Sequence, residues 1–251
     1  MQLLLLLLQP IAIGLLLAIV VGSDVFEIYE ETNITLFVLS CAFIWIGMFN
    51  SIQEVCKERV ILKREYLANL KLPIYILSKL IVLGFICFVQ SLSLVLVISV
   101  FIGLPETGVL LNSFADFLII AFTTIFTATT LGLAISSLAK TGEQAMTITP
   151  FVLIFKLLFS GILFDLSGLA NIASYLTISR WSVSLLGITA NLNEIPLRIQ
   201  EILPAYERQI EDIYVRTAGN VLRNYAMLGL FILSLSISSI LVLRNVAKDS
   251  R

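Results

Sequence analysis

The stretch that decides the fold runs from Pro73 to Ile102 and reads PIYILSKLIVLGFICFVQSLSLVLVISVFI. Lys79 is its one charged residue. A helix needs about 20 mostly apolar residues, at a rise of 1.5 Å per residue, to cross the hydrocarbon core of a bilayer. Because this stretch exceeds that length, it predicts a membrane-spanning helix that can tilt or extend beyond the bilayer.

Five further stretches have the same character, so the sequence predicts an all-α integral membrane protein with six transmembrane helices. The composition agrees, because 59% of the 251 residues are hydrophobic and only 13% are charged, whereas soluble domains average about 25% charged residues. The first stretch has no basic residue before its apolar run, so we expect it to be a retained span rather than a signal peptide. The predicted spans are Leu3–Gly22, Ile34–Ser51, Pro73–Ile102, Phe114–Leu138, Ala145–Phe164 and Tyr225–Leu243.

The composition also excludes several kinds of chemistry. The sequence contains no histidine, which removes the Ser-His-Asp triad, the Cys-His dyad and histidine-ligated zinc. The net charge of −1, with both signs present, does not favour a nucleic-acid partner. Cys41, Cys56 and Cys87 form no CxxC pair, and we interpret them as thiols without a chemical role. We therefore predict no catalytic residue and no metal site.

The distribution of Lys and Arg predicts that both termini are cytoplasmic. Orientation follows the excess of these residues in short loops. Nine of them lie in residues 52–72, in residues 139–144 and after residue 243, and none lies in residues 23–33 or 103–113. We therefore expect a multi-pass protein of the cell membrane with residues 165–224 outside, since basic residues in so long a segment weigh less.

Residues 53–66, QEVCKERVILKREY, are highly charged. Their apolar positions recur at helical spacing on one face, and charged residues fill the other. We predict an amphipathic cytoplasmic connecting helix at the inner membrane surface. Its mixture of acidic and basic residues favours docking of a protein partner over binding of anionic lipid, which attracts mainly Lys and Arg.

The external segment 165–224 divides into two parts. Residues 165–193 are partly apolar and interrupted by glycine, which favours short re-entrant or interfacial helices with Tyr175 and Trp181 at headgroup level. Residues 194–224 are polar and charged, with a helix-compatible composition after Pro204. We predict an external helix there that leads into the last span.

Hydroxyl residues repeat along one face of the fourth predicted span. We favour helix packing over substrate lining, because small hydroxyl residues mark helix contacts in lipid. The stripe comprises Asp116, Thr123, Thr127, Thr130 and Ser137, and is widened by Thr124 and Thr129.

Lys156 lies in the middle of the fifth predicted span, too deep for its ammonium group to reach either surface easily. Such a charge usually faces a bundle interior or a wet cavity and marks a functional candidate. The alternative is a structural pair with a carbonyl or a carboxylate, for which Asp116 is one possible partner.

Six short motifs occur in an order that matches one family of membrane proteins. They are Leu7-Leu8-Gln9-Pro10-Ile11, Glu58-Arg59 followed by Lys63-Arg64-Glu65-Tyr66, Tyr75-Ile76-Leu77-Ser78-Lys79, Gly132-Leu133-Ala134-Ile135-Ser136-Ser137-Leu138-Ala139, Gln144-Ala145 and Ser160-Gly161. Together they span essentially the whole chain. With them, the chain resembles the membrane (permease) domain of ABC exporters of subfamily G, also called the ABC type-2 family.

The resemblance implies that the 251 residues form a single permease domain that pairs with a second permease copy, identical or different. The sequence has no G-x-x-x-x-G-K-[ST] motif, so ATP and Mg are expected on a partner nucleotide-binding ATPase subunit, with no cofactor on this chain. Residues implied to couple to that ATPase are Glu54, Glu58, Arg59, Lys63, Arg64, Glu65, Lys140 and Glu143. One-face spacing and the resemblance give, as lining for the substrate path, Phe43, Ile46, Phe49 and Asn50 on span two and Thr149, Leu153, Lys156 and Ser160 on span five.

The leading hypothesis is thus the permease subunit of an ATP-driven exporter. It moves a hydrophobic or amphiphilic substrate, such as a lipid, peptide or drug, across the lipid membrane. Two alternatives stay open. One is an integral-membrane enzyme that modifies lipids with Lys156 and Ser160, and the other is a non-transporting immunity protein that binds a peptide through its external segment. Dependence on an ATPase partner distinguishes the first hypothesis from both.

Overall fold

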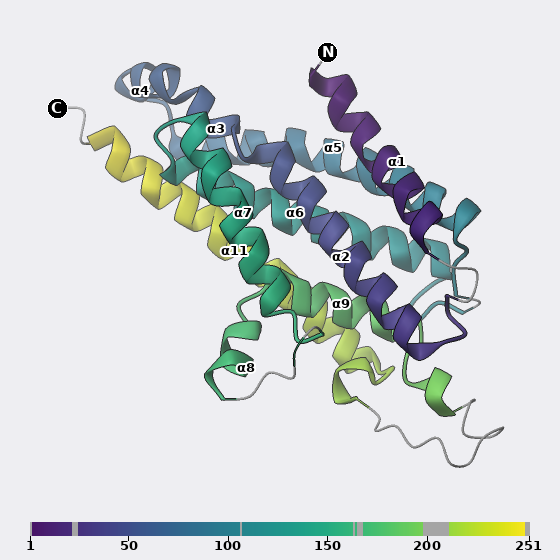
Figure 1. The fold of residues 1–251 in the computed structure, drawn as a ribbon. Helices are drawn as coiled ribbons and strands as arrows, with labels where there is room; N and C mark the ends of the chain where they lie inside the picture. Colours follow the sequence, from purple (N-terminus) through teal and green to yellow (C-terminus); the bar gives the residue numbers. More distant parts are fainter. Residues whose placement is uncertain are drawn as a thin grey trace.

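The computed structural model describes residues 2–21, 25–105, 107–162, 164, 168–197 and 211–248, and every structural statement below concerns these residues. Regular structure within them is helical and includes no strand, in agreement with the predicted all-α fold. Figure 1 shows the elements, which are α1 (Gln2–Val20), α2 (Tyr29–Ser51), α3 (Glu54–Lys57), α4 (Arg59–Leu67), α5 (Leu72–Phe101), α6 (Ser113–Leu138), α7 (Gly142–Leu158), α8 (Leu169–Ser174), α9 (Ile178–Thr189), the 3₁₀ turn η1 (Asp212–Tyr214) and α11 (Ala218–Lys248).

Four helical segments are long and apolar enough to cross a membrane, namely Tyr29–Lys57, Leu72–Phe101, Ser113–Leu138 and Ala218–Asn245. They correspond to the second, third, fourth and sixth predicted spans. Helices α1 and α7 occupy the first and fifth, but both are shorter in their apolar part. The count of six spans therefore stays a prediction.

Helix α7 ends at Leu158, before the predicted end at Phe164. The chain turns at Gly161, whose φ of 83° lies in the left-handed region that glycine adopts without steric penalty. A side-chain oxygen of Thr141 caps the other end of the helix by accepting a hydrogen bond from the Gln144 backbone at 3.2 Å. The two features fix a helix of 17 residues.

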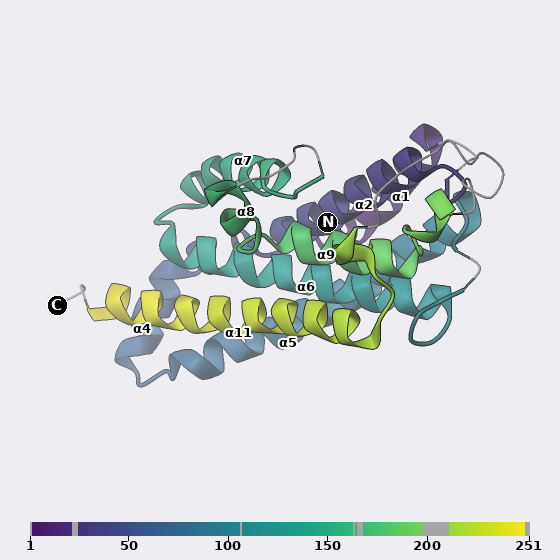
Figure 2. The same cartoon turned by 90° about the horizontal axis from the view of Figure 1, so that it is seen from below.

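Helix α6 is the centre of the bundle. It packs against α2, α5, α9 and α11, and Figure 2 shows it between α2 on one side and α5 and α11 on the other. More than half of its side chains are buried, including the predicted hydroxyl stripe at Thr124, Thr127 and Thr130. The Thr124 hydroxyl donates to Ser182 of α9 at 3.0 Å. The stripe therefore serves helix packing, as predicted.

Glycine and hydroxyl residues bring α2 and α6 into close contact. A Cβ atom on Gly47 of α2 would overlap the Ile125 carbonyl oxygen, and one on Gly132 of α6 would overlap the Ser51 hydroxyl. That hydroxyl donates to the Thr129 carbonyl at 2.7 Å, and the Thr129 hydroxyl donates to the Gly47 carbonyl at 3.0 Å. Small residues thus let the backbones approach and exchange hydrogen bonds.

The connecting segment departs from the prediction in two ways. The single helix predicted over residues 53–66 is wrong, because the chain breaks at Glu58 (φ −93°, ψ 3°) into α3 and α4. Its apolar face is covered by protein rather than by the membrane surface. Val55 and Leu62 are buried in one cluster with Leu72, Leu133 and Leu243, which come from α5, α6 and α11.

The segment after α7 also differs from the prediction. Helix α9 is not interfacial, because it is buried against α2, α6 and α11, and Trp181 is buried with it. The exposed residues of this part include Leu169, Asn171 and Ile172 of α8, and Tyr175 just after it. The external helix predicted after Pro204 is wrong for residues 211–217, which form η1 and extended chain, while residues 198–210 lie outside the described residues.

The start of α1, the end of α11, α3 and α4 lie in the upper part of Figure 1, and α8 and α9 lie in the lower part. This arrangement agrees with termini on one side of the membrane. Their assignment to the cytoplasm stays a prediction.

We expect Gly47→Ala to destabilise the protein by about 1–3 kcal/mol, since the added methyl group forces α2 away from α6. Gly229→Ala in α11 is the matched control, because it adds the same group where nothing lies within 4 Å. Thermal unfolding of the detergent-solubilised chain measures both variants. Equal melting temperatures for the two would contradict the close contact.

Candidate coupling site and cavity

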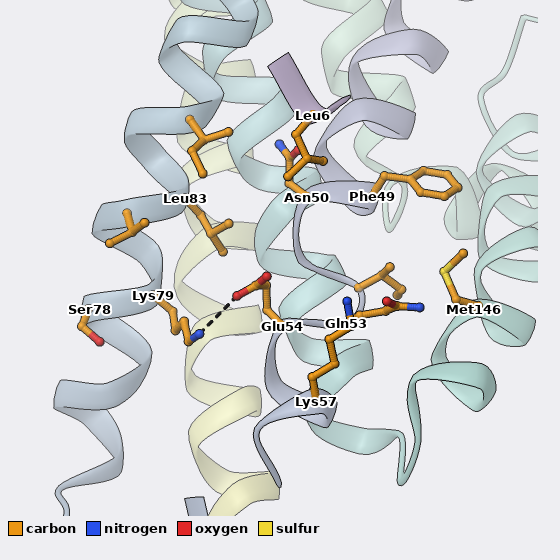
Figure 3. Close-up of a pocket in the computed structure, with 13 residues that line it drawn as sticks. Leu6, Phe49, Asn50, Gln53, Glu54, Lys57, Ser78, Lys79, Leu83 and Met146 are labelled. Atoms are coloured by element: carbon orange, nitrogen blue, oxygen red, sulfur yellow. Dashed lines mark hydrogen bonds and ion pairs between the residues drawn. The ribbon is translucent and has the colours of Figure 1, made fainter. Parts of the chain in front are cut away.

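An ionic cluster joins the connecting segment to the start of α5. The Lys79 ammonium group pairs with Glu54 at 3.1 Å and with Glu58 at 2.7 Å. The Tyr75 hydroxyl donates to the second Glu58 oxygen at 2.8 Å. Figure 3 shows the pairing of Lys79 with Glu54 at the wall of a cavity.

Local sequence spacing aligns the members of this cluster. Glu54 and Glu58 are four residues apart, as are Tyr75 and Lys79, so each pair lies on one side of its segment. Pro73 stands in the first turn of α5, where its missing N–H is not needed, and the helix then carries Lys79 toward the acids. One lysine with two carboxylates leaves the cluster with a formal charge of −1, which a further cation from a partner could balance.

The environment of Glu58 favours its charged form. Partial burial raises the pKa of this carboxyl, but hydrogen bonds from Lys79 and Tyr75 and the lysine charge outweigh burial, so the net pKa lies below its usual value. Glu58 is therefore a carboxylate at neutral pH and holds Lys79 in place.

The same segment is tied to the end of α6. Arg59 donates from Nη1 to the carbonyl of Ala139, the C-cap of α6. The Ser136 hydroxyl accepts from the backbone N–H groups of Val55 and Cys56 at 3.0 and 3.1 Å. Helix ends leave such backbone groups without intrahelical partners. The hydrogen-bonding groups at the ends of these helices are thus satisfied by one another. Helices α3, α4 and α6 are therefore linked by direct hydrogen bonds.

The eight predicted coupling residues separate into two groups. Glu54, Glu58 and Arg59 make the internal contacts described above. The others lie at or near the surface of α4 and of the turn from α6 to α7, where Lys63 is half-buried and the exposed residues are Arg64, Glu65, Lys140 and Glu143. Because Arg59 binds Ala139, next to Lys140, the structure brings the two surfaces to the same end of the bundle.

The roles of Lys79 and Tyr75 as partners of the connecting segment were not predicted. The signal was present in the Tyr75-Ile76-Leu77-Ser78-Lys79 motif, whose two polar ends lie four residues apart on one helix face. What the sequence did not show was which acids they meet, because 21 to 25 residues separate Lys79 from them.

A cavity of about 620 Å³ lies directly beside the cluster. Its wall is partly apolar and partly charged, and it is formed by α1, α2, α3, α5 and α7 (Figure 3). Its lining includes two predicted path residues, Phe49 and Asn50, and the ion-paired Glu54 and Lys79. Asn50 and Gln90 exchange two hydrogen bonds, at 2.6 and 3.0 Å, which fix the α2 side of the wall against α5.

Several predicted path residues lie in the interior of the single chain. Phe43 and Ile46 are completely buried in the main core cluster, so they do not face an open surface of α2. The exposed face of that helix instead carries Trp45, whose ring stacks on Phe49 at a centroid distance of 5.2 Å. The sequence does not distinguish the faces of α2, because apolar residues surround the whole helix and only its contact with α6 decides which side is buried. The lining of the path therefore stays a prediction.

The predicted path residues of α7 and the turn after it are buried as well. They are Thr149, Leu153, Lys156 and Ser160. The opposite face of α7 exposes Phe151, Ile154 and Phe155. Leu153 and Lys156 line an apolar hollow of about 60 Å³, together with Cys41, Trp45 and Ser179.

Lys156 has no ion pair among the described residues. Its suggested partner Asp116 is occupied elsewhere, because this carboxylate accepts from the backbone N–H groups of Val109, Leu110 and Leu111 at 2.5 to 3.1 Å. The pairing of Lys156 with Asp116 is therefore wrong. The Ser160 hydroxyl donates to the Leu157 carbonyl at 2.8 Å, so it is not set up as a nucleophile beside Lys156.

The long apolar helices, with the charged connecting segment α3–α4 at one end of the bundle, define the chain as a helical multi-pass membrane protein. A family model described as ABC-2 type transporter matches residues 1–190, and the chain belongs to that family. The motifs quoted above therefore predicted the family correctly. The chain is the membrane domain of a transporter.

A curated relative supports the same assignment. Over 168 residues the chain is 29% identical to the ABC transporter ATP-binding/permease protein Rv1747 of Mycobacterium tuberculosis. The match covers 65% of this chain but only 19% of the relative. The relative is named as both ATP-binding and permease protein. This chain matches less than a fifth of that longer protein.

The lowered pKa of Glu58 predicts a pH dependence of stability. A carboxyl with a folded-state pKa below its unfolded value of about 4.3 stabilises the fold above that pH and loses this contribution as the pH falls through the folded pKa. We expect Glu58→Gln to be less stable than the parent at pH 7, by no more than about 1 kcal/mol because the pair is partly exposed. The difference should shrink as the pH falls below the unfolded value and disappear once the pH is below the folded-state pKa.

Thermal unfolding of both proteins between neutral and acidic pH measures this difference. Glu65→Gln is the control, because Glu65 is exposed and makes no ion pair with a described residue. A difference between parent and Glu58→Gln that stays constant with pH would refute the ionised pair.

Proposed function

We propose that this chain is the permease of an ATP-driven exporter, energised by a nucleotide-binding domain outside these 251 residues. The family assignment and the ATP-binding part in the relative's name support the partner. The observation that carries the proposal is the link between Arg59 and Ala139, because it joins the charged surface of α4 to the α6–α7 turn. A single docked nucleotide-binding domain can thus act on α4 and on the α6–α7 turn together.

The docking surface mixes charge with exposed apolar side chains. Arg64, Glu65, Lys140 and Glu143 supply both signs of charge. Val60, Ile61, Leu67 and Leu138 are large apolar residues exposed on the same elements. Exposed apolar patches rimmed by charge are typical of protein interfaces. In this assignment the surface, and with it both termini, faces the cytoplasm, where the ATPase binds ATP and Mg.

Motion of the connecting segment reaches the cavity through the ionic cluster. Glu54 and Glu58 hold Lys79, which is itself a wall residue of the cavity. When the ATPase domains close, α3 and α4 shift, and α5 and the end of α6 move with them. Such a change requires that ATP binding favours one arrangement of these contacts over the other.

A second permease copy completes the substrate path. The exposed faces of α2 and α7 carry large apolar side chains, among them Trp45, Phe151 and Phe155. Two such faces, turned toward each other, form a path for a hydrophobic or amphiphilic lipid, peptide or drug. Lys156 lies on the opposite, buried face of α7, in the small hollow beside Trp45. Its positive charge there favours amphiphiles whose acidic group reaches this hollow.

The coupling role is tested with the double variant Glu58→Ala and Arg59→Ala, reconstituted in proteoliposomes with its ATPase. We expect coupled ATP turnover and transport to fall about tenfold, equivalent to about 1.4 kcal/mol, because the linked contacts are lost. Lys71→Ala, an exposed lysine just before α5, is the control. If the double variant assembles and transports like the parent, the coupling assignment is wrong.

The path role of Lys156 is tested with Lys156→Met, which keeps an unbranched side chain, one atom shorter, and removes its charge. We expect thermal stability to be maintained or raised, since a buried charge without a partner is costly. Transport of acidic amphiphiles should fall about tenfold while that of neutral ones is kept. Equal loss for both classes would show that the lysine does not recognise an acidic group.

A further inference from the structure

A second hollow lies at the end of the bundle opposite α4, where α8 and α9 meet η1 and the start of α11. It has a volume of about 310 Å³, and its lining is polar and aromatic. The residues that matter below are Tyr175, Arg180, Trp181, Asp212, Arg223 and Asn224. None of them belongs to the coupling surface or to the proposed substrate path.

Asn224 presents a buried hydrogen-bond acceptor that has no partner within the described part of the chain. Its side chain is 1% exposed. The amide nitrogen donates to the Ser184 hydroxyl at 3.0 Å and to the Asn220 carbonyl at 2.9 Å, so both of its protons are used. The Oδ1 oxygen makes no hydrogen bond with any residue that the structure describes. Since buried polar atoms are normally satisfied, this oxygen calls for a donor, such as a hydroxyl group, from a ligand.

Two arginines place positive charge around the same hollow. The Arg180 guanidinium lies 4.2 Å from the centre of the Tyr175 ring and donates from Nη1 to the Ser174 hydroxyl at 2.6 Å, which fixes its position and leaves other N–H groups available. Arg223 is exposed and makes no ion pair among the described residues. With Asp212 as the one acid of the lining, the formal charge is +1. The hollow therefore favours an anion.

The neighbouring helix places this hollow at the level of lipid headgroups. Leu169, Ile172 and Leu176 recur at helical spacing along α8 and the residues just after it, and all three are exposed. In a membrane protein such a face lies in the interface, with aromatic residues such as Tyr175 at headgroup level. The anionic ligand available at this level is the phosphate of a lipid, which is anchored in the membrane by its acyl chains.

We propose that this hollow binds the headgroup of an anionic phospholipid that carries free hydroxyl groups, of which phosphatidylglycerol is the simplest. The phosphate accepts from Arg180 and Arg223, and a headgroup hydroxyl donates to Asn224 Oδ1. Arginine suits this role because its planar N–H groups bind phosphate oxygens in pairs. Binding needs no ATPase, so it is independent of the proposed export function.

The experiment uses the fluorescence of Trp181, which lines the hollow. The sequence has two tryptophans, Trp45 and Trp181, so a Trp45→Phe background leaves one reporter. Dihexanoyl phosphatidylglycerol is titrated into the full chain in a neutral detergent. We expect a saturable change, with an apparent affinity about tenfold higher than that of dihexanoyl phosphatidylcholine, because only the former adds net charge and hydroxyl donors.

Variants locate the binding site. Arg223→Gln should weaken phosphatidylglycerol binding about tenfold, the order expected for loss of a charge-assisted pair. It should not disturb folding, since Arg223 is exposed. Arg244→Gln is the matched control, because it removes an exposed arginine from the opposite end of the same helix.

Three outcomes would overturn the proposal. Equal affinity for the two lipids would remove the headgroup preference. Equal affinities of Arg223→Gln and Arg244→Gln would place the binding elsewhere. Glycerol 3-phosphate that binds as tightly as phosphatidylglycerol would show that the ligand is a free phosphate ester rather than a lipid.

Discussion

The contact of Gly47 with the Ile125 carbonyl is the constraint on which the rest of the bundle depends. Inside a bilayer, burying apolar side chains between helices gains little, because lipid is equally apolar, so close packing and hydrogen bonds hold helices together. Ser51 and Thr129 supply those bonds between α2 and α6. These bonds fix the register of α2 against α6. Ser136, one turn beyond Gly132, is thereby placed to accept hydrogen bonds from the N–H groups in the first turn of α3.

The charged end of the molecule follows from that register. Once α3 is anchored on α6, the break at Glu58 turns α4 so that Arg59 reaches the last carbonyl of α6 and the two acids face Lys79 of α5. Each contact on its own is worth little at a partly exposed site. Joined through backbone groups at three helix ends, they form a unit in which α4 cannot shift without moving α5 and α6.

Prediction from sequence succeeded where one signal dominates, as in the apolar runs of α2, α5, α6 and α11 and in the hydroxyl stripe around Thr127. It failed where a distant partner decides. The partly apolar composition of residues 165–193 allowed an interfacial position for α9, yet the hydroxyls of Ser179, Ser182 and Ser184 are each hydrogen-bonded inside the bundle. The faces of α2 and α7 could not be distinguished for the same reason, since nearly every position on them is apolar.

The two lysines inside apolar helices show how contacts separate structural from functional charge. Lys79 has two carboxylates and stands near the end of its helix, so its charge is used in holding the connecting segment. Lys156 has no such partner among the described residues. Asp116, the partner suggested from the sequence, instead accepts hydrogen bonds from three backbone N–H groups. A protein that needed only stability would gain by replacing Lys156 with an apolar residue. The proposed function accounts for its presence beside Trp45, because an acidic group of the substrate would supply the missing partner.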